Sequence, residues 1–155
     1  MKKGVYFAPR EVFNQILEWA VIPTFDLVIE YGEQGIILVK RSIAPYKNQW
    51  ALPGLRMLKG ESINDTIARI AQQEVGLTVQ TEGKLYLGQY VGKFTTEHNR
   101  QDLSTCYSVK ISDEKPIVMN KDHFSSYKLI KNIQSEHIGA MYKYYLEQYF
   151  KNRKR

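Results

Sequence analysis

Two segments repeat apolar residues at three- and four-residue steps, which is typical of a helix that buries one face. The second of these carries its own end signals. Ser62 is a candidate N-cap with Asp65 three residues later, as in a capping box, and Gly76 is a candidate C-terminal stop. A third helix, rich in tyrosine, is expected near the end of the chain. The helices are predicted over residues 10–20, 62–75 and 135–150.

Runs of apolar and β-branched residues between the helices predict strands. The runs over residues 25–31 and 36–40 flank a turn at Gly32–Gly35, which predicts a hairpin. Further strands are predicted over residues 79–81, 84–91, 103–111 and 126–130, and loops over residues 42–49, 55–60, 93–102 and 113–122. Helices separated by strands, two of them adjacent, predict an α+β domain with a mixed sheet between helices.

Composition indicates one globular domain in a reducing compartment. The chain has 155 residues, 43% apolar and 25% charged, which excludes a disordered or fibrous chain. The single cysteine, Cys106, excludes an internal disulfide. No apolar run reaches the roughly 18 residues of a membrane span, and no signal peptide is recognisable, so we expect a cytoplasmic protein.

Charge gives little support for nucleic-acid binding. The net charge is +6, but four of the basic residues lie among the last five, so the rest of the chain carries +2. We expect a domain over residues 1–150 and a solvated, frayed basic tail over 151–155. We therefore expect neither a nucleic acid nor a membrane as the partner of this domain.

One segment carries the chemistry. Residues 52–62 and 69–77 resemble the Nudix box, a loop–helix–loop that binds a divalent cation and a nucleoside diphosphate derivative. Glu61, Arg69, Glu74 and Gly76 stand in the register of the box without a gap. The resemblance implies a Nudix-like α/β/α sandwich with a mixed β-sheet, and a Nudix-type hydrolase acting on nucleoside diphosphate-linked substrates.

The departures from the box change the expected metal site. Leu55 replaces a box glycine, Ile70 replaces the glutamate after the arginine, and Gln73 replaces the first paired glutamate. Positions 70, 73 and 74 share one helix face, and only Glu74 is charged there. The sequence therefore predicts one hard cation with oxygen ligands and water instead of a cluster of metals.

A box thinned in this way is similar to that of the GDP-mannose mannosyl hydrolases, and the similarity covers most of residues 20–150. In that subfamily water attacks the anomeric carbon with inversion and the nucleoside diphosphate leaves. The resemblance implies Mg²⁺, with Mn²⁺ as the alternative cation, and a homodimer. It implies that the Gly54 carbonyl and Glu74 hold the metal, that Arg41 and Arg56 bind the diphosphate, that Asp26 lies near the leaving nucleotide, and that Tyr107 donates to the diphosphate.

The resemblance leaves the role of His123 open. The subfamily has a Gln-His pair three and four residues before the tyrosine that matches Tyr127, whereas this chain has His123 and Phe124. Phenylalanine accepts no proton. His123 is therefore either the base after a one-residue shift or a neutral metal ligand, or catalysis is absent.

Other residues have structural interpretations. Glu61 and Arg69 are expected to join the loop to the helix by hydrogen bonds, and Tyr142, Tyr144, Tyr145 and Tyr149 to serve packing or dimer contacts. The function expected from the sequence is Mg²⁺-dependent hydrolysis of a nucleotide sugar at the glycosidic carbon. The alternatives are conventional attack at phosphorus and a catalytically silent nucleotide-binding module.

Overall fold

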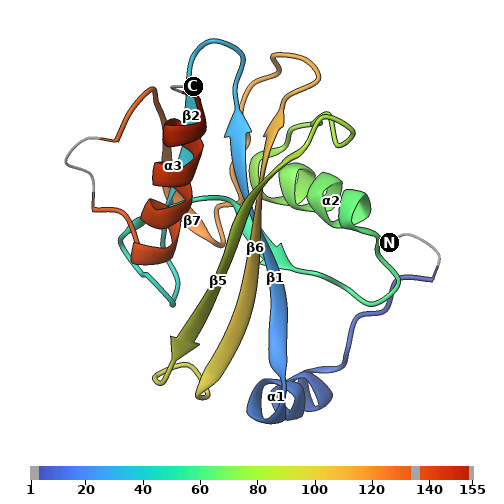
Figure 1. Ribbon diagram of the computed structural model, residues 1–155. Coiled ribbons are helices and arrows are strands. Elements are labelled where there is room, and N and C mark those ends of the chain that lie inside the picture. Colours follow the sequence, from blue (N-terminus) through green and yellow to red (C-terminus); the bar gives the residue numbers. More distant parts are fainter. Residues whose placement is uncertain (1–3, 134–136, 154–155) are drawn as a thin grey trace.

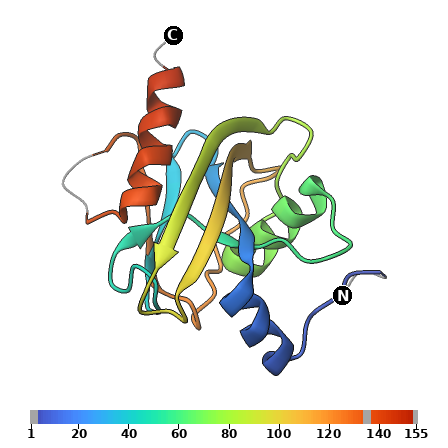
Figure 2. The same cartoon turned by 60° about the horizontal axis from the view of Figure 1, so that its bottom comes forward.

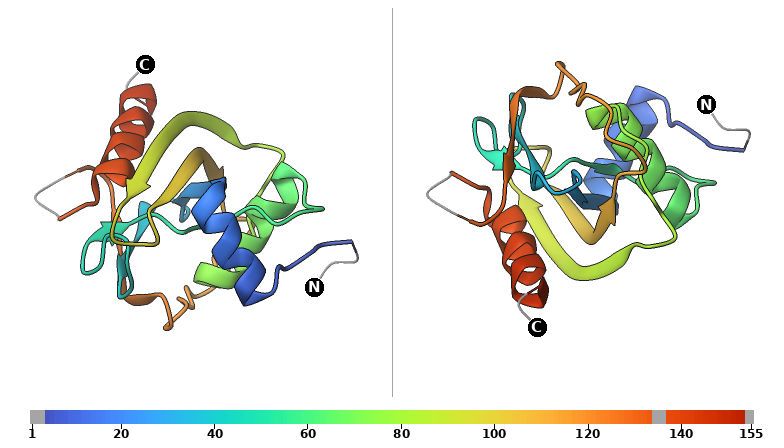
Figure 3. Two further views of the ribbon diagram at one scale, coloured as in Figure 1. Left: turned by 90° about the horizontal axis from the view of Figure 1, so that it is seen from below. Right: turned by 90° about the horizontal axis from the view of Figure 1, so that it is seen from above.

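A mixed sheet between helices forms the single domain, as the sequence predicts (Figures 1 and 2). The computed structural model describes residues 4–133 and 137–153. Helices α2 and α3 lie on opposite sides of the sheet, and α1 lies beside the start of β1 (Figures 1 and 3). The elements are α1 (Arg10–Trp19), β1 (Val21–Glu30), β2 (Ile36–Arg41), β3 (Trp50–Ala51), β4 (Gly54–Arg56), α2 (Ile63–Val75), β5 (Leu85–Phe94), β6 (Arg100–Lys110), β7 (Phe124–Ile130) and α3 (Ala140–Arg153).

The predicted hairpin is present, but its two strands soon take different partners. β1 and β2 pair at Glu30 and Ile36, next to their turn. Beyond that point β1 pairs in parallel with β6 and antiparallel with β4, whereas β2 pairs with β3 and β7. The chain over residues 50–56 therefore crosses from β2 to β1. This crossing sets Gly54 opposite Asp26.

Helix α2 forms where the sequence predicts it, because local signals define both of its ends. The Ser62 hydroxyl accepts from the Asp65 N–H at 3.1 Å, and the Asp65 carboxylate accepts from the Ser62 N–H at 3.0 Å. Gly76 ends the helix with φ 69°, a conformation that disfavours any residue with a Cβ. The face toward the core carries Ile67 and Ile70, both fully buried. The position that holds a glutamate in the box is thus part of the hydrophobic core.

Several strands end at other residues than predicted, because their backbone pairing continues beyond the run of apolar residues. β1 begins at Val21 instead of residue 25, because its parallel pairing with β6 continues to that residue. β5 and β6 reach Phe94 and Arg100, so the loop predicted over 93–102 is shorter. Val79 makes an isolated bridge to Ile111 instead of a strand. β4 lies where a loop was predicted, because cross-strand pairing with β1 orders it.

The last helix also differs. It begins at Ala140 instead of residue 135; residues 137–139 are not helical and residues 134–136 lie outside the described part. It continues through Arg153, whose guanidinium donates to Glu30 at 3.1 Å. The expected frayed tail is thus wrong for 151–153, and 154–155 lie outside the described residues.

The core fills the space between the sheet and the two covering helices, and Cys106 is free and buried within it. Among the described helices, none is long and apolar enough to cross a membrane.

Replacing Gly76 with alanine is expected to destabilise the domain. The alanine would have to adopt the positive φ of Gly76, and its Cβ would lie 3.1 Å from the Val118 Cβ. We expect Gly76→Ala to lower the free energy of unfolding by about 1–2 kcal/mol in urea denaturation. Gly83 has no neighbour within 4 Å of an added Cβ, so Gly83→Ala is the matched control. Equal stability of the two variants would contradict this account of the helix end.

Candidate functional site

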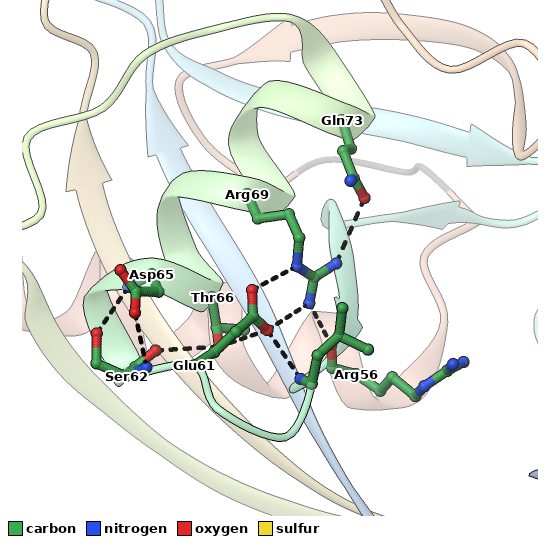
Figure 4. A network of polar contacts seen from close by, with 8 residues as sticks. Arg56, Glu61, Ser62, Asp65, Thr66, Arg69 and Gln73 are labelled. Carbon is green, nitrogen blue, oxygen red and sulfur yellow. Dashed lines mark hydrogen bonds and ion pairs between the residues drawn. The ribbon is translucent and has the colours of Figure 1, made fainter. Parts of the chain in front are cut away.

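A partly buried ion pair joins the loop before α2 to the helix itself (Figure 4). Arg69 Nε donates to Glu61 Oε2 at 2.7 Å, and Arg69 Nη2 donates to Glu61 Oε1 at 2.9 Å. The Leu58 N–H donates to the same carboxylate at 2.8 Å. Arg69 Nη2 also donates to the carbonyl of Arg56 at 2.7 Å. One guanidinium therefore links α2 to both the loop and β4.

These contacts decide the charge state of Glu61. Burial by itself raises the pKa of this carboxyl, but the hydrogen bonds from Arg69 and the Leu58 N–H outweigh it and lower the pKa below its ordinary value. Glu61 is thus held as a carboxylate. With 4% of its side chain exposed, it forms a charge pair largely shielded from solvent.

Glu74 lies in the last turn of α2 and is fully buried. Its two carboxylate oxygens lie 2.9 and 3.0 Å from Nδ1 of His123, which precedes β7. Among the described residues, His123 is the only side chain that hydrogen-bonds this carboxylate. Burial raises the pKa of Glu74, and His123 and Arg41 lower it by less. This carboxylate is therefore short of compensating positive charge.

Arg41 ends β2 and is held by its own loop. Its Nε donates to the carbonyl of Pro45 at 2.5 Å, and its Nη2 donates to that of Ala44 at 3.2 Å. The positive charge of Arg41 lowers the pKa of Asp26 as well as that of Glu74. One guanidinium therefore acts on two acids that come from different elements.

Asp26 is buried in β1 and belongs to a polar chain that leads to α3. The Ser104 hydroxyl donates to Asp26 Oδ2 at 2.5 Å, and the Tyr145 hydroxyl donates to Ser104 Oγ at 2.8 Å. Burial raises the pKa of Asp26 to about 7, against smaller opposing effects of Ser104 and Arg41. A Cβ on Gly54 would lie 2.2 Å from Asp26 Oδ1, so the close approach of β4 to this carboxyl requires glycine there.

Glu74 thus contacts His123, Gly54 closely approaches Asp26, and the charge of Arg41 acts on both acids. Arg56 does not join them in the same way, because its guanidinium stacks on the rings of Phe13 and Phe7, at 4.0 and 4.7 Å from their centroids. Burial, with the charges of Arg100 and Arg69, lowers its pKa.

Tyr107 lies on the opposite face of the sheet from Asp26. It contacts the rings of Phe25 and Tyr86. Successive side chains of a strand alternate between faces, and Ser104 shares the face of Asp26. Tyr107, three residues further along the regularly paired β6, therefore points to the opposite face from Asp26.

Sequence reasoning missed the partners of Asp26. Tyr145 was assigned to packing or dimer contacts, and nothing singled out Ser104. The available signal was the run of polar residues on one face of β6, where Asp102, Ser104 and Ser108 alternate with the other face and are all buried in the structure. Phe124 is 2% exposed, so a buried phenyl ring occupies the position of the subfamily base.

Known proteins share this fold. A model of the NUDIX domain matches residues 22–138. The low-salt glycan biosynthesis protein Agl8 of Haloferax volcanii is 27% identical over 120 residues, which are 74% of each chain. The MutT NUDIX hydrolase of Burkholderia pseudomallei superposes with a TM-score of 0.70 at 17% identity, over 82% of this chain and 96% of its own. The NUDIX domain of Shewanella oneidensis NrtR, complexed with ADP ribose, gives 0.68 at 18% identity, over 94% of both chains. These structures confirm the fold that the resemblance implied.

Removing the charge of Glu61 is expected to destabilise the domain. Glu61→Gln would leave Arg69, whose side chain is 16% exposed, without its counter-charge. We expect the free energy of unfolding in urea to fall by about 2–3 kcal/mol. The control is Glu82→Gln, because Glu82 is exposed and bonds only Asn64 among the described partners. A loss of unfolding free energy no larger than that of Glu82→Gln would contradict a stabilising role for this ion pair.

Asp26 is expected to make stability fall as pH rises. Its folded pKa of about 7 exceeds the ordinary 3.8, so the stability it contributes is fully present below pH 3.8 and is lost as pH rises through 7. In EDTA, Asp26→Asn should gain stability over the unaltered chain by up to about 1.4 kcal/mol per pH unit between these values. Urea unfolding across this range tests it, with exposed Asp113→Asn as control. Parallel pH profiles for the unaltered chain and Asp26→Asn would refute it.

Proposed function

Because the chain belongs to the Nudix family, whose enzymes hydrolyse nucleoside diphosphate derivatives, we propose that it cleaves a nucleotide sugar of the GDP-mannose type, releasing the sugar and the nucleoside diphosphate. The thinned box and the subfamily resemblance over residues 20–150 support this substrate class. The name of Agl8, a glycan biosynthesis protein, agrees with nucleotide-sugar chemistry.

The observation that carries the proposal is the buried Glu74 carboxylate against His123, within the electrostatic reach of Arg41. A fully buried carboxylate with a raised pKa and one imidazole partner fits a divalent cation, because bound positive charge would offset its desolvation. No group of three His, Cys, Asp or Glu side chains gathers anywhere in residues 4–133 and 137–153. The chain would therefore supply Glu74, His123 and the Gly54 carbonyl, and water or substrate the remaining ligands.

We assign roles to the other residues on chemical grounds. Mg²⁺ or Mn²⁺, when bound, supplies positive charge beside the leaving diphosphate. Arg41, whose Nε and Nη2 donate to the carbonyls of Pro45 and Ala44, would turn its remaining N–H donors to the same phosphates. Asp26, held by Ser104, is suited to accept a hydrogen bond from the leaving nucleotide. Stabilising a good leaving group in this way fits a site with few carboxylates.

Three sequence assignments enter this proposal in altered form. Arg56 would contact a diphosphate only after leaving the rings of Phe7 and Phe13. Tyr107 points to the opposite face from Asp26, so a substrate would have to reach both faces of the sheet to contact both residues. His123 is retained as a metal ligand rather than a base, because its Nδ1 is directed at Glu74. We extend the proposal to a cytoplasmic homodimer, as the resemblance implies.

Product analysis in ¹⁸O-labelled water tests the reaction. With GDP-mannose and Mg²⁺ or Mn²⁺, the proposal expects label in the released sugar and none in phosphate. Glu74→Gln should lower turnover by roughly 100-fold or more, since it removes the one charged metal ligand. Glu18→Gln, on the exposed face of α1, is the matched control and should retain full activity.

Two outcomes would overturn the proposal in different ways. Label in phosphate would establish conventional attack at phosphorus. A ligand-induced rise in melting temperature without turnover, over a panel of nucleotide sugars, dinucleotides and nucleoside triphosphates, would establish a silent binding module.

A further inference from the structure

The pairing of Glu74 with His123 has a consequence for the choice of cation. We infer that this pair is a mixed oxygen and nitrogen site that takes Mn²⁺, Co²⁺ or Zn²⁺ in preference to Mg²⁺ before any substrate is bound. The inference rests on the proposed function, since it concerns the cation of the same site. It changes the sequence expectation, in which Mg²⁺ came first and Mn²⁺ was the alternative cation.

The spacing of the two side chains suits shared coordination of one ion. Nδ1 of His123 lies 2.9 and 3.0 Å from the two oxygens of Glu74. Ligand atoms on neighbouring corners of an octahedron with bonds of about 2.1 Å lie about 3 Å apart. The imidazole nitrogen and the carboxylate oxygens are therefore spaced for one shared ion, which would replace the present hydrogen bond between them.

Both residues are held by the backbone around them. The N–H of Asn120 donates to the carbonyl of Glu74 at 2.9 Å, and the N–H of His123 donates to the carbonyl of Asn120 at 3.1 Å. The carbonyl of His123 accepts from the N–H of Ser42 at 2.8 Å, next to Arg41. The segment that carries the imidazole is thus fixed to both α2 and β2. About a third of the His123 side chain, 32%, is exposed, so an ion can approach from solvent.

The donor atoms decide which cation is preferred. Mg²⁺ dehydrates reluctantly and is usually bound through one or two carboxylates with substrate phosphates. Here Ile70 and Gln73 leave Glu74 as the one carboxylate of its helix face. Imidazole, in contrast, suits first-row transition metals, whose affinity rises from Mn²⁺ to Co²⁺. Without a nucleotide, the substrate-free protein therefore offers a ligand set that transition metals bind and Mg²⁺ binds weakly.

Direct binding to the substrate-free protein tests this inference independently of turnover. Isothermal titration with Mn²⁺, Co²⁺, Zn²⁺ and Mg²⁺ should give affinities for the transition metals at least about 10-fold above that for Mg²⁺. The Co²⁺ complex should show a visible absorption spectrum that changes in His123→Gln. That variant should lose about 10-fold or more in Co²⁺ and Zn²⁺ affinity and leave Mg²⁺ affinity unchanged, because its amide offers oxygen instead of nitrogen.

Controls separate this site from others. His98→Gln, at an exposed loop histidine, should bind every cation as the unaltered chain does. Melting temperatures in EDTA identify any variant that has not folded, and the Co²⁺ spectrum of the unaltered chain then remains the test. Mg²⁺ affinity equal to that of Co²⁺, or a preference that survives His123→Gln, would overturn the inference.

The result that would overturn the proposed function differs from the result that would overturn the cation preference. If the cations bind with dependence on Glu74 but not on His123, only the inference about cation choice is overturned and the metal site stands. If no cation binds in a manner that Glu74→Gln abolishes, the metal site itself is wrong, and the proposed function falls with it.

Discussion

The ion pair of Arg69 and Glu61 is the contact on which the geometry of the site depends. The loop between β4 and α2 must be joined to both elements for Gly54 and Glu74 to keep a fixed relation. Arg69 achieves this because its guanidinium bonds Glu61 in the loop and the carbonyl of Arg56 in β4. A bidentate fork is suited to this task, since its planarity fixes orientation as well as distance. The depressed pKa of Glu61 shows that the pair stays charged despite its burial.

The divergence of β1 and β2 then determines which residues can meet. Asp26 lies on the face that α3 contacts through Tyr145 and Ser104, whereas Glu74 comes from α2 on the other side of the sheet. Had the two strands paired along their whole length, the sheet would separate these acids. Because they pair next to their turn and then part, Arg41 at the end of β2 acts on both carboxyls. The site is therefore a product of topology as much as of the box.

What the sequence predicted and what it missed follow from the range of the interactions involved. The capping box of Ser62 and Asp65 and the stop at Gly76 are contacts within a few residues, so the limits of α2 could be read directly. The stacking of Arg56 on Phe13 joins segments more than forty residues apart, and no local pattern signals it. The pairing that orders β4 depends likewise on β1. The match to the register of the box located Glu74. Its contact with His123 depends on the residue at which β7 begins, and the spacing of residues in the sequence does not predict that residue.

The burial of Phe124 restricts which side chains residue 124 can carry. Its ring sits at the start of β7, opposite Arg41, and is almost completely enclosed. A histidine at this position would place a polar ring among core side chains, which costs free energy unless the ring finds a hydrogen-bond partner. A proton acceptor at residue 124 would therefore need accompanying changes among the side chains that enclose it.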